Sequence, residues 1–455
     1  MTLLKTLLAV ALTLFTTCVT AADRPNIVLI LMDDMGWRDV GFMGNTFTET
    51  PNLDRLAAGG LVFSQAYASA PNCAPTRACL MSGQYTPRHG IYTVVDPRQP
   101  PGSPWQKLLA SDSQSELDTR IVTVAESLRD GGYATGFFGM WNLGRGRSGP
   151  VTPGGQGFET VVFPENLGFG KDQYFDDSGN YLSDRLTDSV LQFVEKNRSG
   201  PFFVYLPDHA VHAPYNPKPD LLKKYEQKLQ QTGDRRDSAE AAATVEAVDQ
   251  NVGRIMDGLK SMNLLENTIV IFTSDNGGTP QFTAPLKGSK GQLYEGGIRV
   301  PLVVSWPGLK NPGRTTPVPV SSVDWYPTLL ELAGLTAPQG QIQDGVSLVP
   351  LFRGSDTLQR DRLFWHFPCY VGRSAPSSAV RVGDYKLVEF FEDGGHVELY
   401  DLQQDPNEEH DLAAEMPARR DELTKILKTW QKETAAAIPN TANPDFDPQA
   451  QRTRG

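Results

Sequence analysis

The sequence predicts an α/β fold built on a large mixed, mostly parallel sheet sandwiched by helices. Four short runs of apolar residues lie in the first two thirds of the chain, at residues 26–32, 133–138, 202–206 and 268–272. Continuous apolar runs of this length are typical of strands that are covered on both faces. Between the third and fourth runs, residues 239–262 have the amphipathic pattern of a long helix. With 455 residues, the chain is long enough for one large domain and a smaller one.

The first 21 residues have the pattern of a secretory signal peptide. A basic residue, Lys5, precedes an apolar stretch over residues 7–15, and small residues follow up to Ala21. A membrane anchor is one alternative, but the apolar stretch is too short and too rich in threonine to span a bilayer well. Lipidation at Cys18 is another, for which the preceding residues are a poor match. We therefore predict a secreted or periplasmic protein with no stable membrane insertion.

The protein is acidic, which limits the partners that its overall charge attracts. It has 42 Lys and Arg residues against 53 Asp and Glu residues, a net charge of −11. Removal of Lys5 with the signal peptide leaves 41 basic residues and a net charge of about −12. A field of this sign does not attract nucleic acid or other polyanions. An anionic substrate must therefore be held locally, by a metal ion and a few placed basic side chains.

The mature chain keeps an odd number of cysteines. Without Cys18, the remaining ones are Cys73, Cys79 and Cys369. An odd count in an exported protein indicates a free or modified thiol. The sequence leaves open whether Cys79 and Cys369 form a disulfide bond or stay as buried free thiols.

Polar residues follow the predicted strands at the point where each strand ends. Asp33 and Asp34 come directly after the first run, and Asp275 and Asn276 follow the fourth. The segment 207–214, after the third run, contains two of the six histidines. In open α/β sheets, ligands bind outside the carboxyl ends of the strands. Segments far apart in the sequence are therefore expected to converge on one site.

The acidic pairs at these strand ends indicate a site for a hard metal ion. Asp33, Asp34, Asp275 and Asn276 all offer oxygen ligands, which calcium and magnesium prefer. No cluster of cysteine and histidine suggests zinc. Turn formation is the alternative explanation, because Asp and Asn are common after strands.

The segment from Cys73 to Gly83 has the pattern of a short capped helix. Pro75 suits a first helical turn, and Gly83 suits a helix end. Cys73 then lies at the helix N-terminus, where free N–H groups and the helix dipole favour an anion. Arg77, four residues later, lies on the same face.

This segment also resembles the signature of the type I sulfatases, which belong to the alkaline phosphatase superfamily. The resemblance lies in Cys73-Ala74-Pro75-Thr76-Arg77, followed by an apolar stretch and Ser82-Gly83. It extends from about Pro25 to about Leu412. It implies that a formylglycine-generating maturation enzyme oxidises Cys73 to formylglycine. The hydrate of that aldehyde is the nucleophile that attacks the sulfur of a sulfate ester.

The resemblance also implies roles for the other site residues. The metal is calcium, with ligands Asp33, Asp34, Asp275 and Asn276 and an oxygen of the modified residue 73. Arg77 fixes the modified residue and its charge. His212 contacts the sulfate and protonates the leaving oxygen, and Lys290 contacts a sulfate oxygen. The family pattern places the nearby Glu295 and Arg299 as residues that brace the loop.

The sequence departs from the family pattern at two positions. The second sulfatase signature, Gly-Lys-Trp-His-x-Gly, reads here Gly139-Met140-Trp141-Asn142-Leu143-Gly144. Met140 cannot supply the lysine's charge, and Asn142 can hydrogen-bond but cannot move a proton near neutral pH. Loss of one stabilising donor commonly costs about 10²–10³ in rate, and loss of an acid or base about 10²–10⁴.

Three interpretations of these substitutions are open. Another side chain, such as His209 or Lys287, fills the gap; for His209 we favour a structural role. Alternatively the enzyme is slow, or the protein binds sulfated glycans without turning them over. The retained Cys73 segment, metal pairs, His212 and Lys290 favour an active enzyme.

The last hundred residues have a different pattern. Short strands separated by turn residues are predicted over 379–388 and 397–402, and a helix over 415–434. The resemblance implies a small antiparallel sheet packed with that helix. We therefore predict a catalytic domain over residues 22–354, an α+β subdomain over 355–434 and a loose tail over 435–455.

The substrate expected from the resemblance is a sulfated carbohydrate. His366, next to Trp365, resembles a segment at the pocket rim of carbohydrate-active relatives, although simple packing explains it equally well. A phosphomonoester, phosphodiester or phosphonate hydrolase of the same superfamily is the rival expectation.

Overall fold

The computed structural model describes residues 24–94, 102–170, 173–232, 238–371 and 374–450. The predicted signal peptide and Cys18 lie outside these residues. Within the described part, no helix combines the length and apolar character needed to cross a bilayer.

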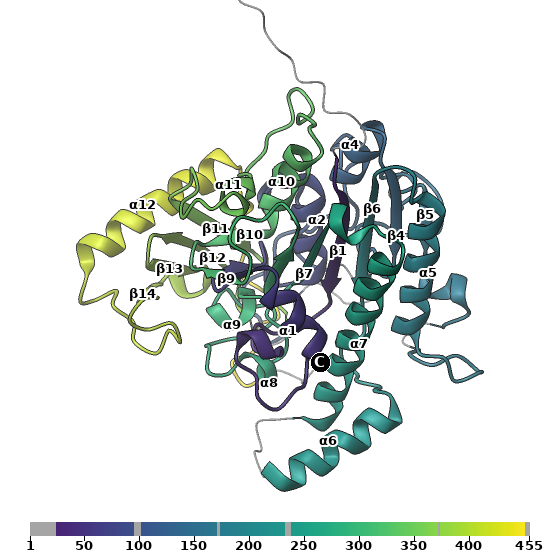
Figure 1. Ribbon diagram of the computed structural model, residues 1–455. Coiled ribbons are helices and arrows are strands. Elements are labelled where there is room, and N and C mark those ends of the chain that lie inside the picture. The colour runs from purple at the N-terminus through teal and green to yellow at the C-terminus, as the bar shows by residue number, and fades with distance from the viewer. Residues whose placement is uncertain (1–23, 95–101, 171–172, 233–237, 372–373, 451–455) are drawn as a thin grey trace, which may run out of the picture.

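Eight strands form the main sheet: β1 (Asn26–Met32), β2 (Leu61–Phe63), β4 (Ala134–Phe138), β5 (Thr160–Val162), β6 (Phe202–Asp208), β7 (Thr268–Ser274), β8 (Leu302–Ser305) and β9 (Arg314–Thr316). Their spatial order is β5-β4-β6-β1-β7-β8-β2-β9. Figure 1 shows the labelled strands β5, β4, β6, β1, β7 and β9 in this order from right to left. Every neighbouring pair is parallel except those that β8 makes with β7 and β2. The predicted α/β class is confirmed, and the four apolar runs correspond to β1, β4, β6 and β7.

Helices cover both faces of this sheet. The helices of this part of the chain are α1 (Pro51–Ala58), α2 (Cys73–Ser82), α3 (Thr86–His89), α4 (Val124–Asp130), α5 (Leu182–Asn197), α6 (Pro219–Thr232), α7 (Ala239–Ser261), α8 (Pro280–Thr283), α9 (Glu295–Ile298), α10 (Trp325–Leu332) and α11 (Val349–Phe352). Short 3₁₀ turns are η2 (Gly41–Met43), η3 (Pro164–Leu167), η4 (Leu265–Asn267), η5 (Ser322–Asp324) and η6 (Glu392–Gly394). A two-stranded sheet pairs β3 (Ala66–Tyr67) with β10 (Val320–Ser321).

The central strand β1 shows why the sheet is covered on both sides. Successive strand residues point to opposite faces. Ile27, Leu29 and Leu31 belong to one core cluster with residues of α2, α4 and α10. Val28 and Ile30 belong to a second, with residues of α1, α5 and α7. All seven residues of β1 are buried, which explains the continuous apolar run in the sequence.

A four-stranded antiparallel sheet follows in the C-terminal part: β11 (Arg362–Phe367), β12 (Ser377–Val382), β13 (Tyr385–Phe390) and β14 (Val397–Asp401). The helix α12 (Pro417–Glu433) packs on it, and Trp430 stacks on Phe364 with ring centroids 4.7 Å apart. Figure 1 shows this unit at the opposite end of the molecule from β5. The predicted small sheet and helix are confirmed. The edge strand β11 was not among the predicted strands.

The end of the described chain differs from the loose tail predicted for residues 435–455. Its backbone pairs with an earlier segment, because Leu109 N–H donates to Thr441 O at 2.9 Å and Asn443 N–H donates to Lys107 O at 2.9 Å. The buried Asn443 amide also donates to Ser103 O at 3.0 Å. Composition favours a flexible tail, but these long-range contacts are not visible in local sequence.

The three described cysteines are all free and buried. Cys79 Sγ lies 3.4 Å from His89 Nε2, and Cys369 Sγ faces Ser111 O at 3.9 Å. The structure therefore answers the open question about Cys79 and Cys369: they do not pair.

Candidate active site

The predicted site residues come together at the carboxyl ends of four neighbouring strands. The backbone continues the hydrogen-bond pattern of the sheet just past these ends. Asp275 N–H donates to Met32 O at 3.0 Å, Asp33 N–H donates to Asp208 O at 3.1 Å, and Met140 N–H donates to Pro207 O at 3.1 Å. The positions of Asp33, Asp275 and Met140 are therefore fixed by backbone contacts between β4, β6, β1 and β7.

Arg77 is the central residue of this cluster. Its guanidinium is completely buried and donates to Asp33 Oδ2 at 2.9 Å. It also donates to Asp275 Oδ2, from Nε at 3.0 Å and from Nη2 at 2.9 Å. A third contact goes to the carbonyl oxygen of Met140. One side chain of α2 thus connects the ends of β1, β7 and β4.

Helix α2 carries Cys73 and Arg77 into the cluster, as the sequence predicts. All ten of its residues are buried. Asn72 caps its N-terminus, because its side-chain oxygen accepts from Cys73 N–H at 2.7 Å. Gly83 ends the helix in the left-handed conformation, with φ 70°. Asn72 was not singled out in the sequence, although an Asn directly before a helix is a recognisable cap signal.

The Cys73 thiol itself is held in its neutral form. Burial raises the pKa of this thiol well above its usual value, and the nearby carboxylates Asp33, Asp275 and Asp34 raise it further, against the opposing effect of Lys290. These effects outweigh the anion-stabilising helix N-terminus that the sequence indicates. Since the thiolate is the reactive form of cysteine, an unmodified Cys73 is a poor nucleophile here.

Three of the predicted metal ligands form a compact donor set. Ligand atoms of Asp33, Asp34 and Cys73 all lie within 4.8 Å of one another, and all three residues are buried. Asp33 Oδ1 is buried and has no hydrogen-bond partner among the described residues. An orphaned, buried carboxylate oxygen is costly unless a further group binds it. The two carboxylates therefore fit a hard cation, whereas the neutral thiol of the unmodified Cys73 is a soft donor that such an ion does not favour.

The other two predicted ligands adjoin this set. Asp275 Oδ1 and Asp34 Oδ1 both accept from Asn276 Nδ2, each at 2.7 Å. Asn276 thus presents its amide nitrogen to the carboxylates, while its oxygen accepts from Gly278 N–H at 2.9 Å. The two ends of the amide are nearly equal in size, so rotation of the amide would turn its oxygen to the cluster.

The pKa values of Asp33 and Asp275 are strongly perturbed. Burial alone raises the pKa of Asp33, but Arg77, His209 and Lys290 together outweigh burial and hold it well below its usual range. For Asp275, burial and the neighbouring Asp33 raise the pKa to about 7, although Arg77 opposes them. Two acids that share one guanidinium therefore behave differently. A bound cation would favour the ionised form of both.

Two histidines face the same carboxylates. His212 Nε2 lies 3.6 Å from Asp34 Oδ2, and His209 Nδ1 lies 3.0 Å from Asp33 Oδ2. The two rings stack with centroids 4.4 Å apart. Burial lowers the pKa of His212, whereas Asp33 outweighs burial and raises the pKa of His209. The sequence interpretation favoured a structural role for His209, but the turn after β6 places it in the cluster.

The tautomer of His212 follows from its other contact. His212 Nδ1 lies 2.6 Å from Ala213 O. A carbonyl oxygen can only accept, so Nδ1 carries the hydrogen and donates it. Nε2 is therefore the atom of His212 that is available to exchange a proton on the side of the carboxylates.

The two candidate lysines lie three residues apart but point to different places. Lys290 Nζ lies 2.7 Å and 2.8 Å from the two oxygens of Asp34. Lys287 Nζ instead donates to Tyr400 Oη at 2.8 Å, and it lies over the ring of Tyr294. Lys290 is therefore in the cluster, and Lys287 does not fill the missing lysine position.

The two substituted positions lie at the end of β4. Met140 is half-buried, and Arg77 bonds to its backbone rather than to its side chain. Asn142 is half-buried with φ 60°, a left-handed conformation that Asn adopts more readily than most residues. Among the described residues, its side chain has no hydrogen-bond partner. Neither residue supplies a charge to the cluster.

His366 lies outside the site. It is buried on β11, where Nδ1 contacts Ser378 Oγ at 2.6 Å and Nε2 contacts Ala437 O at 3.1 Å. Burial lowers its pKa to about 4, so it stays neutral. The packing explanation for this residue is therefore the right one.

Comparison with known proteins gives consistent matches over nearly the whole chain. A family model described as Sulfatase matches residues 25–335, and a model of the C-terminal part of N-sulphoglucosamine sulphohydrolase matches residues 289–435. A sulfatase of Formosa agariphila is 33% identical over 93% of this chain and 90% of its own length. Human arylsulfatase A is 32% identical over 90% of this chain and 87% of its own length.

Solved structures share the fold. The crystal structure of Ps i-CgsB in complex with k-i-k-neocarrahexaose has a TM-score of 0.75 and 28% identity, and the match covers 92% of this chain and 95% of that one. A phosphonate monoester hydrolase of Agrobacterium radiobacter has a TM-score of 0.67 and 21% identity, over 90% of this chain and 96% of that one. At that identity the second likeness shows the fold alone.

The central role of Arg77 can be tested by its removal. Because Arg77→Met leaves Asp33 and Asp275 buried without their cation, we expect it to lower the free energy of unfolding by about 3–5 kcal/mol in metal-free buffer. Arg77→Lys is expected to rescue only part of this, since one ammonium cannot bond both carboxylates in the same planar geometry. Urea denaturation measures the change.

The matched control is Arg55→Met, because Arg55 pairs with Asp257 on the surface. We expect that variant to stay within about 0.5 kcal/mol of the wild type. An Arg77→Met protein as stable as the control would show that the carboxylates do not depend on this guanidinium.

Proposed function

This chain belongs to the sulfatase family and is a sulfuric ester hydrolase, and we propose that it acts on a sulfated carbohydrate. We further propose that its nucleophile is a formylglycine made from Cys73 and that strand-end carboxylates hold a calcium ion. The observation that carries this proposal is the orphaned, buried oxygen Asp33 Oδ1 beside Asp34 and Cys73.

A calcium ion fits the chemistry of the donor set. Asp33, Asp34, Asp275 and Asn276 would hold it, together with an oxygen of the modified residue 73. Oxygen donors of this kind suit calcium. Bound there, the ion would supply positive charge beside the sulfate group, and the formylglycine hydrate would supply the hydroxyl that attacks sulfur.

The charge balance favours a sulfate ester over a phosphate monoester. A cation bound at Asp33 would weaken the interaction that raises the pKa of His209, so both histidines are counted as neutral. Three carboxylates then face the two cations Arg77 and Lys290, an excess of one negative charge before the metal is added. A divalent cation would turn this into an excess of one positive charge. That charge balances the single negative charge of a sulfate ester, but not the second charge of a phosphate monoester. Met140, in place of the family lysine, keeps the positive charge low.

The remaining residues have roles that follow from their positions. Arg77 holds Asp33 and Asp275 in place beneath residue 73. The Lys290 ammonium, beside Asp34, is placed to hold a sulfate oxygen. His212 Nε2 can give a proton to the leaving oxygen, because Nδ1 is committed to Ala213 O. Asn142 can donate a hydrogen bond where the family has a histidine.

A sulfated carbohydrate is the substrate class that the relatives support. Human N-acetylgalactosamine-6-sulfatase is 29% identical over 92% of this chain and 87% of its own length. The structure of Ps i-CgsB contains a neocarrahexaose. We also propose export of the protein to the periplasm or the medium. Since Cys73 is only 4% exposed, a maturation enzyme must modify it before folding is complete.

The function is tested by sulfate release from a panel of sulfated mono- and oligosaccharides. The full chain is co-expressed with a formylglycine-generating enzyme, and conversion of Cys73 is confirmed by peptide mass. With calcium, we expect many equivalents of sulfate per protein on at least one sugar, measured by ion chromatography. Cys73→Ala, which cannot be matured, is the control and should release none.

Other outcomes separate the rival functions. Saturable binding of a sulfated sugar with at most one equivalent of sulfate released would indicate a binding protein without turnover. Faster release of phosphate or phosphonate from the corresponding esters would place the chain with the phosphoester hydrolases of the superfamily.

Calcium binding is expected to stabilise the protein. At a free calcium concentration about a hundredfold above Kd, the gain in unfolding free energy is about 2.7 kcal/mol. Asp34→Asn should weaken calcium binding at least about tenfold, because it removes a charged oxygen ligand. Calorimetric titration and thermal unfolding with and without calcium measure both effects. Asp257→Asn, at an exposed carboxylate, should bind calcium like the wild type.

Restoring the family residues at the two substituted positions is expected to raise turnover. Met140→Lys with Asn142→His should increase kcat about tenfold or more, because a lost charge and a lost acid each commonly cost at least about 10² and do not add. The control Met140→Leu with Asn142→Gln keeps the approximate size without charge or proton transfer. Equal kcat in the two fully matured double variants would mean that other groups already perform these roles.

A further inference from the structure

The loop that carries Lys290 is held from its outer side by the C-terminal sheet. Lys287 Nζ, near the start of this loop, donates to Tyr400 Oη of β14 at 2.8 Å. Tyr294 Oη, near its end, donates to Glu398 Oε2 of β14 at 2.7 Å. Lys290, which lies between these two residues in the chain, reaches Asp34 instead.

A buried ionic cluster holds Glu295, the residue that follows Tyr294 in the chain. Lys386 Nζ, on β13, lies 3.0 Å from Glu295 Oε1 and 2.9 Å from Glu408 Oε1. Glu408 Oε2 accepts from Glu295 N–H at 2.6 Å, at the start of α9. The three side chains are at most 1% exposed. Lys386 of the C-terminal sheet therefore holds the side chain of Glu295, and Glu408, in the segment after β14, holds its backbone.

Such a cluster exists only if the surrounding structure holds it firmly. Burial and the nearby Glu295 raise the pKa of Glu408 to about 7, against the opposing effect of Lys386. For Glu295, burial raises the pKa, but Lys386 and then Arg299 outweigh it and lower it. Glu408 also has φ 59°, a conformation uncommon for glutamate. Buried ion pairs and local backbone strain of this kind persist where other contacts fix the geometry.

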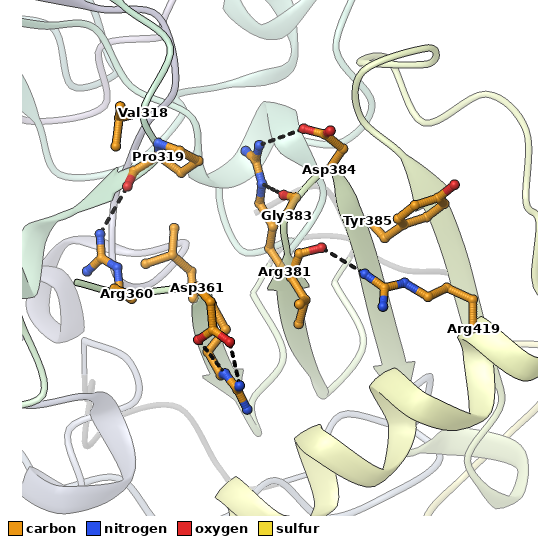
Figure 2. A pocket seen from close by; sticks show the side chains of 12 residues that line it. Val318, Pro319, Arg360, Asp361, Arg381, Gly383, Asp384, Tyr385 and Arg419 are labelled. Carbon is orange, nitrogen blue, oxygen red and sulfur yellow. Dashed lines mark hydrogen bonds and ion pairs between the residues drawn. The ribbon is translucent and has the colours of Figure 1, made fainter. Parts of the chain in front are cut away.

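A second chain of contacts leads to Glu295 from the same sheet. Arg381 lies in the wall of a cavity between β12, β13 and residues 318–319, where its Nε donates to Gly383 O at 2.9 Å (Figure 2). Its Nη1 donates to Tyr67 Oη at 2.6 Å, and Tyr67 Oη donates to Glu295 Oε2 at 2.8 Å. Glu295 is thus held by two residues of the C-terminal sheet, one of them through Tyr67.

The path from Glu295 back to Lys290 is short and tightly packed. Gly296 N–H donates to Lys287 O at 2.8 Å, and Lys290 N–H donates to Gly278 O at 2.8 Å. A side chain at Gly296 would lie 2.4 Å from Gly288 O, and one at Gly297 would lie 2.0 Å from Gln292 O. The loop is therefore closely packed between Glu295 and Lys290, and this packing is the route by which a shift of Glu295 can reach Lys290.

We propose that Lys386 and Glu408 are positioning residues for sulfate ester hydrolysis, which act through Glu295 to keep the Lys290 ammonium beside Asp34. Neither residue touches the substrate. The inference rests on the proposed function in one respect, the role of Lys290 in holding a sulfate oxygen. If these residues act in this way, the C-terminal sheet supports the active site and is not a separate module.

The test compares Lys386→Met and Glu408→Gln with the control Lys428→Met in the full, matured chain. Lys428 also bonds a glutamate of β13, Glu389, but it is 51% exposed and lies on α12. Hydrogen exchange followed by mass spectrometry reports the opening of residues 287–299. Steady-state kinetics and inhibition by inorganic sulfate report the site itself.

In both test variants we expect amides of residues 287–299 to exchange about tenfold or more faster than in the wild type, because local opening is no longer opposed by the cluster. We expect kcat/KM to fall about 10- to 100-fold, the usual cost of losing such supporting residues. Inorganic sulfate should inhibit more weakly. Lys428→Met should match the wild type in all three measurements.

Two results would overturn the inference. One is unchanged exchange over residues 287–299 in the folded variants. The other is faster exchange with kcat/KM and sulfate inhibition within about twofold of the wild type, which would make the cluster purely structural. If Lys386→Met does not fold, Glu408→Gln, which keeps the side-chain shape, decides alone. If the wild type neither turns over nor binds sulfate, the proposed function fails, and the exchange measurement still decides whether the cluster holds the loop.

Discussion

The buried guanidinium of Arg77 is the interaction on which the rest of the site depends. Adjacent parallel strands bring Asp33 and Asp275 to the same sheet edge, away from water, where two carboxylates repel each other. Arg77 bonds both, and a completely buried planar guanidinium can do so where an ammonium could not. The same side chain sets the position of α2, and through it the position of Cys73. The proposed nucleophile and the proposed metal ligands are therefore connected by one shared side chain.

This arrangement also explains how the site keeps its frame with two family residues replaced. Arg77 reaches the end of β4 through the carbonyl oxygen of Met140, a contact that does not depend on the side chain at that position. The backbone around Met140 and Asn142 is held by β6 as well, through Pro207 O. Substitution there changes the charge and the proton-transfer capacity of the site without removing the contacts that shape it. His209, beside His212, adds an imidazole to the same cluster.

Residues 290–295 connect two buried ionic clusters, because Lys290 contacts Asp34 in the cluster at the strand ends and Glu295 contacts Lys386 in the other. Each is costly to desolvate, and each is balanced by ion pairs between different parts of the chain. Lys290 belongs to the first cluster and is anchored by the second. The orientation of one catalytic-site ammonium thus depends on a sheet that contributes no residue to the carboxylate cluster.

The sequence by itself determined the α/β class, the strands β1, β4, β6 and β7, the helix from Cys73 to Ser82 and the acidic pairs that follow β1 and β7. These features follow from local apolar patterns, helix caps and strand-end positions. All of these depend on residues that are close together in the sequence. The tertiary structure alone decided that His209 joins the site, that Lys290 rather than Lys287 reaches Asp34, that His366 is structural and that the tail packs on residues 103–111. Those outcomes depend on contacts between residues that lie far apart in the chain. Arg77 and Asp275, for example, are in contact although 198 residues separate them. Long-range packing selects such pairs, and no local pattern encodes them.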